Sequence, residues 1–228
     1  MLFDLDDTLR DWRAAIDTAI DALVTEAGLE PRDAMRDAVW AAIDEHCVAW
    51  RDGMVMDRAY WKLLYEGAHV LARVLPDGVH DIDELTTGFR QRLRPPLFAD
   101  TEPALRALAA RLPLGILSNN PRAGDAAERQ GIAEYFDAVV GLDPIAGKPA
   151  REAFEKGCEA MGVEPAACAY VGDSYENDLV GATEAGLHSI WLDRDGFDYE
   201  RPPGTYRITS LSEAWPLLED LAQGSARR

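Results

Sequence analysis

From residue 95 to the end of the chain, short apolar segments alternate with segments of helical periodicity. The apolar segments are typical of buried strands and lie at residues 114–117, 136–140, 169–171 and 189–192, with a last one around Ile208. Helices are expected between them at 101–112, 122–130, 151–161, 179–185 and 211–221. Strands that alternate with helices in this way pair in parallel. The pattern therefore predicts an α/β fold, a doubly wound, Rossmann-like parallel sheet with helices on both faces.

The N-terminal third has a different pattern. Residues 1–5 form a short apolar run typical of a buried strand, and the residues that follow are apolar at helical spacing. Four helical stripes begin near Trp12, Val39, Trp61 and Ile82. We predict a Rossmann-like core of residues 1–11 and 95–222, an inserted all-helical cap at 12–94 and a flexible tail at 223–228. Because ligands bind at the carboxyl ends of parallel strands, an insertion after the first strand would cover that edge.

Composition narrows the range of partners. The chain has 228 residues, of which 47% are hydrophobic, and a formal net charge of −18. This charge repels nucleic acids and anionic membranes at long range, so we expect neither as a partner. Acidic residues interrupt the N-terminus where a signal peptide would be apolar, and no apolar run approaches the ~20 residues of a membrane span. We expect a cytoplasmic monomer or homodimer that binds a small molecule.

The cysteines and histidines form no metal-binding pattern in the sequence. The three cysteines are expected to be free thiols in a reducing compartment, since no Cys-x-x-Cys pair occurs among Cys47, Cys158 and Cys168. The four histidines are scattered, and we assign packing or surface roles to His46, His69, His80 and His188.

The first predicted strand ends in the acidic motif Asp4-Leu5-Asp6-Asp7-Thr8. In extended backbone, Asp4 and Asp6 project to the same side, where two carboxylates repel each other. A hard cation such as Mg²⁺ removes this repulsion, and a carboxyl that stays protonated is suited to act as a general acid. The alternative is structural: a strand end, a solvated acidic turn and a helix capped by Thr8.

Two further segments are suited to bind an anion. Ser118 and Asn119 follow a strand and offer a hydroxyl and backbone N–H groups, although they also fit an N-cap pair. Lys148 lies in a Gly-Lys-Pro turn and is one of three lysines among 23 basic residues. A lysine in a chain that otherwise uses arginine indicates a need for a compact charge, against the alternative of a solvated loop residue. In a chain of this net charge, a phosphate site needs such a local cation.

The last motif follows the strand at 169–171. Asp173 directly follows that strand, and Asp178 lies about one helical turn beyond it with Asn177 beside it. These residues are suited to bind a metal ion and to support its ligands, or else they are acids that favour a helix N-terminus. Together the four motifs supply a nucleophile, an acid/base, a hydroxyl donor, a fixed cation and a metal ligand. Phosphoryl transfer through an aspartyl phosphate requires this set.

In order and residue type, these motifs resemble those of the haloacid dehalogenase-like (HAD) hydrolase superfamily, in particular phosphatase-type members with a helical cap inserted after the first motif. The resemblance covers essentially the whole chain and implies a role for each motif. Asp4 would be the nucleophile and Asp6 the acid/base, whose backbone carbonyl also reaches the metal. Ser118, Asn119 and Lys148 would bind the phosphate, and Mg²⁺ would be held by Asp4, Asp6 and Asp173 with support from Asn177 and Asp178.

The function expected from this resemblance is a Mg²⁺-dependent phosphomonoesterase that acts on a small phosphorylated metabolite. The alternatives are a 2-haloacid dehalogenase, a phosphomutase of the same fold and a non-catalytic binding protein. Candidates for substrate contact are the residues that leave the first motif and a turn of the cap, namely Arg10, Trp12, Arg13 and residues 51–56. Asn120 stands where many relatives have glycine or a basic residue, so it marks a departure from the second motif.

Overall fold

The structure is a computed structural model, and it describes residues 1–41, 67–73, 81–143, 146–197 and 199–225. The chain forms two compact units. One consists of Met1–Asp11 together with Leu97–Arg228, and the other of Trp12–Pro96.

The first unit is built on a six-stranded sheet in the order β3-β2-β1-β4-β5-β6, and all pairs of neighbouring strands are parallel. The predicted α/β fold with a parallel sheet is therefore confirmed. The first strand lies in the middle, where Phe3 pairs with Ile116 on one side and Val171 on the other. The strands are β1 (Leu2–Phe3), β2 (Gly115–Ser118), β3 (Ala138–Gly141), β4 (Ala169–Gly172), β5 (His188–Leu192) and β6 (Tyr206–Ile208).

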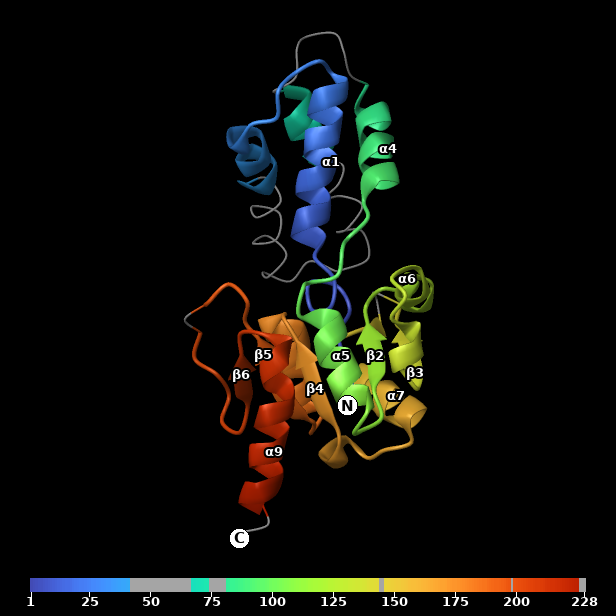
Figure 1. Ribbon diagram of the computed structural model, residues 1–228, viewed down its shortest axis with the longest axis vertical. Helices are drawn as coiled ribbons and strands as arrows, with labels where there is room; N and C mark the ends of the chain where they lie inside the picture. The colour runs from blue at the N-terminus through green and yellow to red at the C-terminus, as the bar shows by residue number, and fades with distance from the viewer. Residues whose placement is uncertain (42–66, 74–80, 144–145, 198, 226–228) are drawn as a thin grey trace. The chain divides into compact units, whose positions relative to one another are not determined.

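Helices cover both faces of this sheet (Figure 1). Adjacent strand residues point to opposite faces, so Leu2 and Phe3 belong to different hydrophobic clusters. Phe3 packs in the cluster that contains residues of α5 (Thr101–Ala109), α6 (Ala123–Arg129) and α9 (Ala214–Ser225). Leu2 packs in the cluster that contains residues of α7 (Arg151–Met161) and α8 (Gly181–Glu184). Burial on two faces explains why the central strands are apolar and without polar alternation.

Some element bounds differ from those expected. Strand β1 is shorter than the predicted 1–5, although the Asp4 N–H still donates to the Val171 carbonyl at 2.9 Å. The helix expected at 179–185 begins earlier, as the π-helix η5 (Tyr175–Val180), because the Ser174 side chain accepts a hydrogen bond from the Asn177 N–H. Helix α9 extends to Ser225, into the segment predicted as a flexible tail.

Short 3₁₀ turns complete this unit. They are η2 (Ala133–Tyr135), η4 (Pro165–Ala167) and η6 (Leu211–Glu213). A capping box between Ser210 and Glu213 begins η6, which leads into α9. At the C-terminal end of α7, Gly162 adopts a left-handed φ of 66° and ends the helix.

In the second unit, the described residues are mainly helical. They form α1 (Trp12–Glu26), α4 (Ile82–Arg92) and the helical segments 33–41 and 67–73. Their apolar faces share one core, in which Ile20, Phe89 and Leu71 are buried. The Asp81 side chain caps α4 by accepting a hydrogen bond from the Asp83 N–H at 2.8 Å. Parts of the second and third predicted helices, and the expected turn at 51–56, lie outside the described residues.

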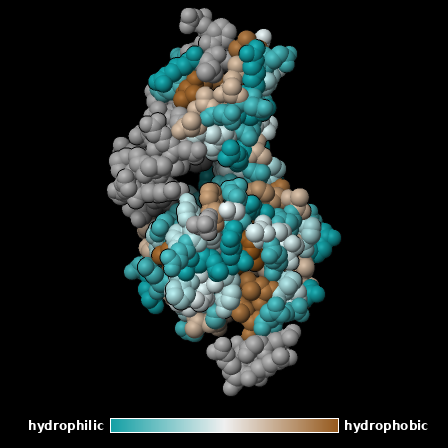
Figure 2. Space-filling model, turned by 90° about the vertical axis from the view of Figure 1, so that its left-hand side faces the viewer, coloured by the Kyte–Doolittle hydropathy of each residue, from teal (hydrophilic) through white to brown (hydrophobic). Residues whose placement is uncertain are grey.

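On the face shown in Figure 2, hydrophilic residues predominate and hydrophobic ones form limited patches between them. This agrees with a composition in which 28% of the residues are charged. Within the described part of the chain, no helix has the length and apolar character needed to cross a membrane.

Candidate active site

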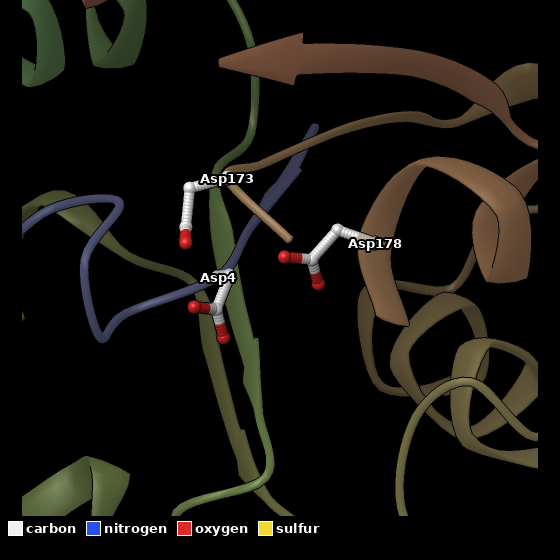
Figure 3. A group of neighbouring side chains, drawn as sticks. All are labelled: Asp4, Asp173 and Asp178. Atoms are coloured by element: carbon white, nitrogen blue, oxygen red, sulfur yellow. The ribbon is translucent and has the colours of Figure 1, made fainter. Parts of the chain in front are cut away.

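Three carboxylates converge at the carboxyl ends of the central strands (Figure 3). Asp4 follows β1, Asp173 follows β4, and Asp178 lies within η5. One ligand oxygen from each of the three lies within 4.8 Å of the others. Neighbouring strands that run in parallel bring these ends to one edge of the sheet, as the sequence predicted.

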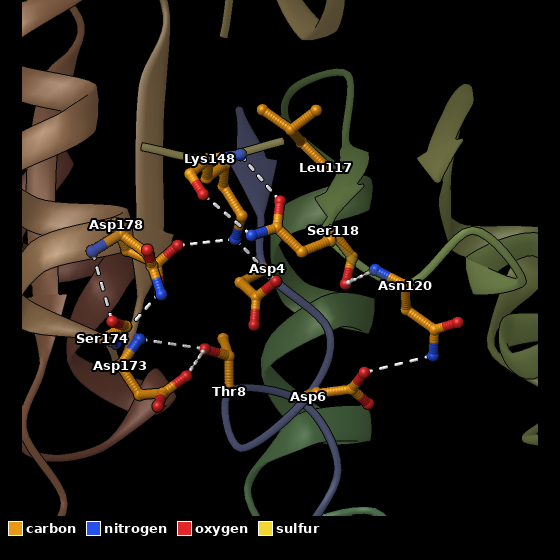
Figure 4. A network of polar contacts seen from close by, with 12 residues as sticks. Asp4, Asp6, Thr8, Leu117, Ser118, Asn120, Lys148, Asp173, Ser174 and Asp178 are labelled. Carbon is orange, nitrogen blue, oxygen red and sulfur yellow. Dashed lines mark hydrogen bonds and ion pairs between the residues drawn. The ribbon is translucent and has the colours of Figure 1, made fainter. Parts of the chain in front are cut away.

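The ammonium group of Lys148 is buried among these acids (Figure 4). It donates to Asp4 Oδ1 at 2.7 Å, to Asp178 Oδ1 at 2.6 Å and to the Tyr170 hydroxyl at 2.6 Å. An ammonium group has three N–H donors, so these three partners use all of them. Lys148 is only 3% exposed, and its charge is therefore fixed in position beside Asp4.

The second motif fixes the backbone that carries Lys148. The Asn119 side chain accepts a hydrogen bond from the Lys148 N–H at 2.7 Å and donates one to the Lys148 carbonyl at 2.9 Å. A Cβ atom at position 147 would collide with the Asn119 side chain, so the close approach of the two loops requires Gly147. The Gly-Lys pair of the third motif thus follows from the packing of the second motif against it.

The hydrogen bonds distinguish Asp178 from the other two acids. Asp178 accepts from Lys148 and Tyr170 at Oδ1 and from the Ser174 N–H at Oδ2, the last at 3.0 Å. A Cβ atom at Gly172 would collide with its carboxylate, which accounts for the Gly-Asp pair of the motif. Both oxygens of Asp178 are therefore engaged, as expected of a supporting residue.

Asp4 and Asp173 each keep one oxygen available. Asp4 uses Oδ1 for Lys148, and Asp173 uses Oδ1 to accept a hydrogen bond from the Thr8 hydroxyl at 2.7 Å. Among the described residues, no hydrogen bond reaches the other oxygen of either carboxylate. The Asp173 backbone is held as well: its N–H donates to Thr8 Oγ1 at 3.0 Å, and its carbonyl accepts from the Trp191 indole at 2.8 Å.

Burial shifts the pKa values of the charged side chains in this cluster. Desolvation raises the pKa of Asp4 to about 7; Lys148 opposes this rise, and Asp178 and Asp6 add to it. Desolvation also raises the pKa of Asp173 well above its ordinary value, with Asp178 and Asp4 as the main neighbouring charges. For Lys148, burial lowers the pKa, but Asp178 and Asp4 outweigh it and the net direction is upward. Crowded carboxylates of this kind are a set of oxygen donors that fits a hard divalent cation.

Asp6 has partners different from those of Asp4. Its two oxygens accept hydrogen bonds from Arg10 Nε and from Asn120 Nδ2, the latter at 3.1 Å. The expectation that Arg10 contacts substrate is not supported, because its side chain is 7% exposed and directed at Asp6. Arg13, another expected contact, lies in the second unit with its guanidinium over the Trp40 ring.

Ser118 and Asn177 are the remaining predicted site residues. Ser118 is buried at the end of β2, and its hydroxyl accepts a hydrogen bond from the Asn120 N–H at 3.3 Å. Asn177 donates its backbone N–H to Ser174 Oγ at 3.2 Å. The contacts of Tyr170 were not predictable from the sequence, since an aromatic residue inside an apolar strand resembles an ordinary core residue. Thr8, a helix cap in the structural alternative for the first motif, forms hydrogen bonds with the side chain and the backbone N–H of Asp173.

A family model of haloacid dehalogenase-like hydrolases matches residues 1–186. The chain belongs to this family. The membership that the four motifs indicated is thus confirmed. The helical residues between β1 and β2 agree with the cap inserted after the first motif.

Curated relatives of this HAD-like hydrolase include phosphatases. It is 32% identical over 131 residues to N-acylneuraminate-9-phosphatase of Homo sapiens, a match that covers 55% of this chain and 53% of that protein. The chain therefore spans about half the length of that relative. It is 28% identical over 231 residues to phosphoglycolate phosphatase of Chromobacterium violaceum, covering 96% of this chain and 95% of the relative.

Solved structures share the fold. A HAD-hydrolase, YfnB of Bacillus subtilis, has a TM-score of 0.73 at 22% identity, with 95% of this chain and 96% of that chain covered. A 2-haloacid dehalogenase from Pseudomonas syringae pv. Tomato DC3000 has a TM-score of 0.58 at 25% identity, with 96% and 97% covered. Solved structures named as a HAD phosphatase and as a 2-haloacid dehalogenase both share this fold, so the chemistry has to be argued from the site.

Proposed function

We propose that this chain is a Mg²⁺-dependent phosphomonoesterase that acts on a small phosphorylated metabolite through an aspartyl phosphate. The observation that carries the proposal is the pairing of Asp4 with the buried Lys148 ammonium, next to the partly engaged carboxylate of Asp173. This arrangement offers an anionic nucleophile, a fixed positive charge and oxygen ligands for a cation. Names of relatives, including phosphoglycolate phosphatase and phosphoserine phosphatase, support the same class of reaction.

Asp4 and Asp173 would hold the cation through their available oxygens, with the backbone carbonyl of Asp6 as the further ligand expected from the family. Asp178 would support them from its bonds to Lys148 and Ser174. When bound, Mg²⁺ supplies positive charge that offsets the repulsion between the phosphate and the carboxylates. Ser118 and the Asn119 backbone N–H would bind phosphate oxygens that do not leave.

In the first step, a carboxylate oxygen of Asp4 attacks phosphorus while the bond to the leaving oxygen breaks. Asp6 gives its proton to that oxygen, so the product is an alcohol. In the second step, the Asp6 carboxylate takes a proton from water, and the resulting hydroxide attacks phosphorus. The bond to Asp4 breaks, which releases phosphate and restores the Asp4 carboxylate. Throughout, the Lys148 ammonium remains beside Asp4 and offsets the charge that develops there.

The dehalogenase alternative has less support from the site. Displacement of a halide leaves an anion that needs no proton, so an acid such as Asp6 would have no task in the displacement step. A phosphomutase would use the same residues and differ only in returning the phosphoryl group to a sugar.

A panel of phosphorylated metabolites, assayed for phosphate release with Mg²⁺ and with EDTA, tests the proposal. We expect release from one or more phosphomonoesters that stops with EDTA and returns when Mg²⁺ is added back. Halide release from 2-haloacids that is indifferent to EDTA, without phosphate release, would support the dehalogenase instead. Transfer of phosphate between positions of a sugar phosphate would indicate the mutase.

A further inference from the structure

The turn that carries Asp6 is closed tightly by its own backbone. The Asp7 N–H donates to the Arg10 carbonyl at 2.9 Å, and the Arg10 N–H donates to the Leu5 carbonyl at 3.1 Å. Asp7 has a φ of 61°, a left-handed conformation that aspartate tolerates better than most residues. Thr8 and Leu9 form the middle of this turn, and the Leu9 carbonyl accepts from the Thr101 hydroxyl at 2.8 Å. The backbone therefore defines the turn without help from the Arg10 side chain.

The Arg10 side chain nevertheless folds back and is buried against Asp6. Its Nε–H donates to Asp6 Oδ1, and the guanidinium is almost removed from solvent. Burying an arginine has a high desolvation cost, which an ion pair only partly offsets. A surface arginine in this turn would avoid that cost, so the burial points to a role beyond closing the turn.

A second donor holds the other oxygen of the same carboxylate. Asn120 Nδ2 donates to Asp6 Oδ2 at 3.1 Å (Figure 4). The orientation of this amide is itself determined, because its Oδ1 accepts a hydrogen bond from the Arg122 N–H at 3.0 Å. The amide group that faces Asp6 is therefore the donor. Each oxygen of the Asp6 carboxylate therefore accepts a hydrogen bond from a side chain of defined orientation.

We propose that Arg10 and Asn120 are positioning residues that hold the Asp6 carboxyl in the orientation it needs for proton transfer. This inference rests on the proposed phosphatase function. Hydrogen-bond donors on both oxygens restrict rotation of the carboxyl group about its own axis. When Asp6 gives its proton to the leaving oxygen, the carboxylate that forms already has the guanidinium beside it. The same pair holds that carboxylate when it later takes a proton from water.

The test uses two substrates that differ in their need for an acid. The p-nitrophenolate leaving group is stable without a proton, whereas an alkoxide from a simple alkyl phosphate requires one. The measured quantity is the rate at which Asp4 becomes phosphorylated in a single turnover, followed by rapid mixing and acid quench. The variants are Arg10→Met and Asn120→Ala, with Asp6→Asn as the reference for loss of the acid. Arg151→Met is the matched control, since it removes an exposed ion pair with Glu155 in α7.

We expect Arg10→Met and Asn120→Ala to lower the rate with the alkyl phosphate on the order of tenfold to a hundredfold. The rate with p-nitrophenyl phosphate should change little, as it should for Asp6→Asn, and Arg151→Met should behave like the wild type. Combined with Asp6→Asn, either variant should add little further loss, because it acts through Asp6.

Three results would overturn the inference: equal losses with both substrates, no loss with either, or a faster reaction than in the wild type. Equal losses would show a structural role alone. If Arg10→Met does not fold, Asn120→Ala decides the outcome, because it leaves the buried ion pair in place. A wild-type protein without phosphatase activity would instead refute the proposed function. The two failures are therefore distinguishable.

Discussion

Asp4 and Asp6 lie two residues apart in one motif, yet their surroundings are opposite. Asp4 is 6% exposed and bonds to the Lys148 ammonium in a cluster in which Lys148 and Asp178 are also buried. The Asp6 side chain is 27% exposed and is held by Arg10 and Asn120 at the start of the turn after β1. The alternation of an extended strand predicted the same side for both carboxylates, but the chain leaves the β1 ladder before Asp6.

The difference matches the tasks proposed for the two groups. A nucleophile that is to remain anionic benefits from a fixed cation, which here opposes the rise in the Asp4 pKa that burial causes. An acid/base has to exchange its proton with the leaving group and with water, so it needs a side open to them. Burial beside a fixed ammonium group suits the first task, and partial exposure with orienting donors suits the second.

The strongest test of the buried half is Asp4→Asn. The amide has the same shape but is not an anionic nucleophile, so we expect complete loss of turnover while the substrate still binds. Phosphate release measures the first effect, and titration calorimetry of the substrate measures the second. Asp33→Asn, at an exposed carboxylate in the second unit, should leave both unchanged. Turnover that survives in Asp4→Asn would remove Asp4 as the nucleophile.

The corresponding change in the exposed half is Asp6→Asn. We expect a loss of about 10²–10⁴-fold in turnover of alkyl phosphates, which is the usual contribution of a general acid/base. Both steps should slow, so aspartyl phosphate should persist after acid quench longer than in the wild type. If both steps proceed at the normal rate, Asp6 has no acid/base role and the comparison with Asp4 loses its meaning.

The sequence was most informative where a motif coincides with the end of a strand. Asp4, Ser118 and Asp173 were predicted at one edge because parallel strands bring their carboxyl ends together, and the structure has them after or at the ends of β1, β2 and β4. Helix α7 was predicted with its observed bounds, because its periodicity and the glycine that follows it are local signals.

Contacts that depend on tertiary packing were not predictable in this way. Tyr170 has no local signal that separates it from a core aromatic residue, yet its hydroxyl contacts Lys148 and Asp178. Arg10 was expected to contact substrate because it is a charged residue close to the motif, whereas the turn directs it at Asp6. A local signal for this turn was Asp7, since aspartate tolerates the left-handed backbone conformation that a tight turn requires.

Mg²⁺ binding should stabilise the protein more at pH 8 than at pH 5. Burial, opposed by Lys148 and reinforced by Asp178 and Asp6, raises the pKa of Asp4 from 3.8 to about 7. Between these two pKa values, the Asp4 carboxyl is ionised in the unfolded chain and protonated in the folded protein. This carboxyl therefore lowers the free energy of unfolding as pH rises, and the full cost is present above pH 7. Mg²⁺ requires the ionised carboxylates and removes that cost.

At 100 times its Kd, Mg²⁺ should contribute about 2.7 kcal/mol at pH 8 and much less at pH 5. Thermal unfolding with and without Mg²⁺ at matched ionic strength measures the difference. Asp4→Asn should reduce the stabilisation at the higher pH. A stabilisation that is equal at both pH values, or larger at pH 5, would contradict a cation site built on Asp4.

Tyr170→Phe should have the smallest effect of these changes. It tests whether the Tyr170 hydroxyl helps to hold the Lys148 ammonium in position beside Asp4. The ring keeps its edge-to-face contact with Phe154, and Lys148 keeps both carboxylate partners. The change removes the hydroxyl that accepts from Lys148 and that donates to Asp178 Oδ1 and to the Leu117 carbonyl. We expect a loss of about 1–2 kcal/mol in the free energy of unfolding, because one accepted and one donated hydrogen bond are lost and each has a typical net value near 1 kcal/mol. Chemical denaturation measures it, with Tyr206→Phe as the control because within the described chain its hydroxyl makes no hydrogen bond.

If Tyr170 only fills space, Tyr170→Phe and Tyr206→Phe should unfold alike and both should retain wild-type turnover. If its hydroxyl helps to fix the Lys148 ammonium beside Asp4, Tyr170→Phe should also lower turnover equally for alkyl and p-nitrophenyl phosphates. That equality is the counterpart of the selective loss expected at Arg10 and Asn120. In the proposed mechanism, Lys148 acts on the nucleophile, which both substrates need, whereas Asp6 acts on the leaving oxygen, which only the alkyl phosphate needs protonated.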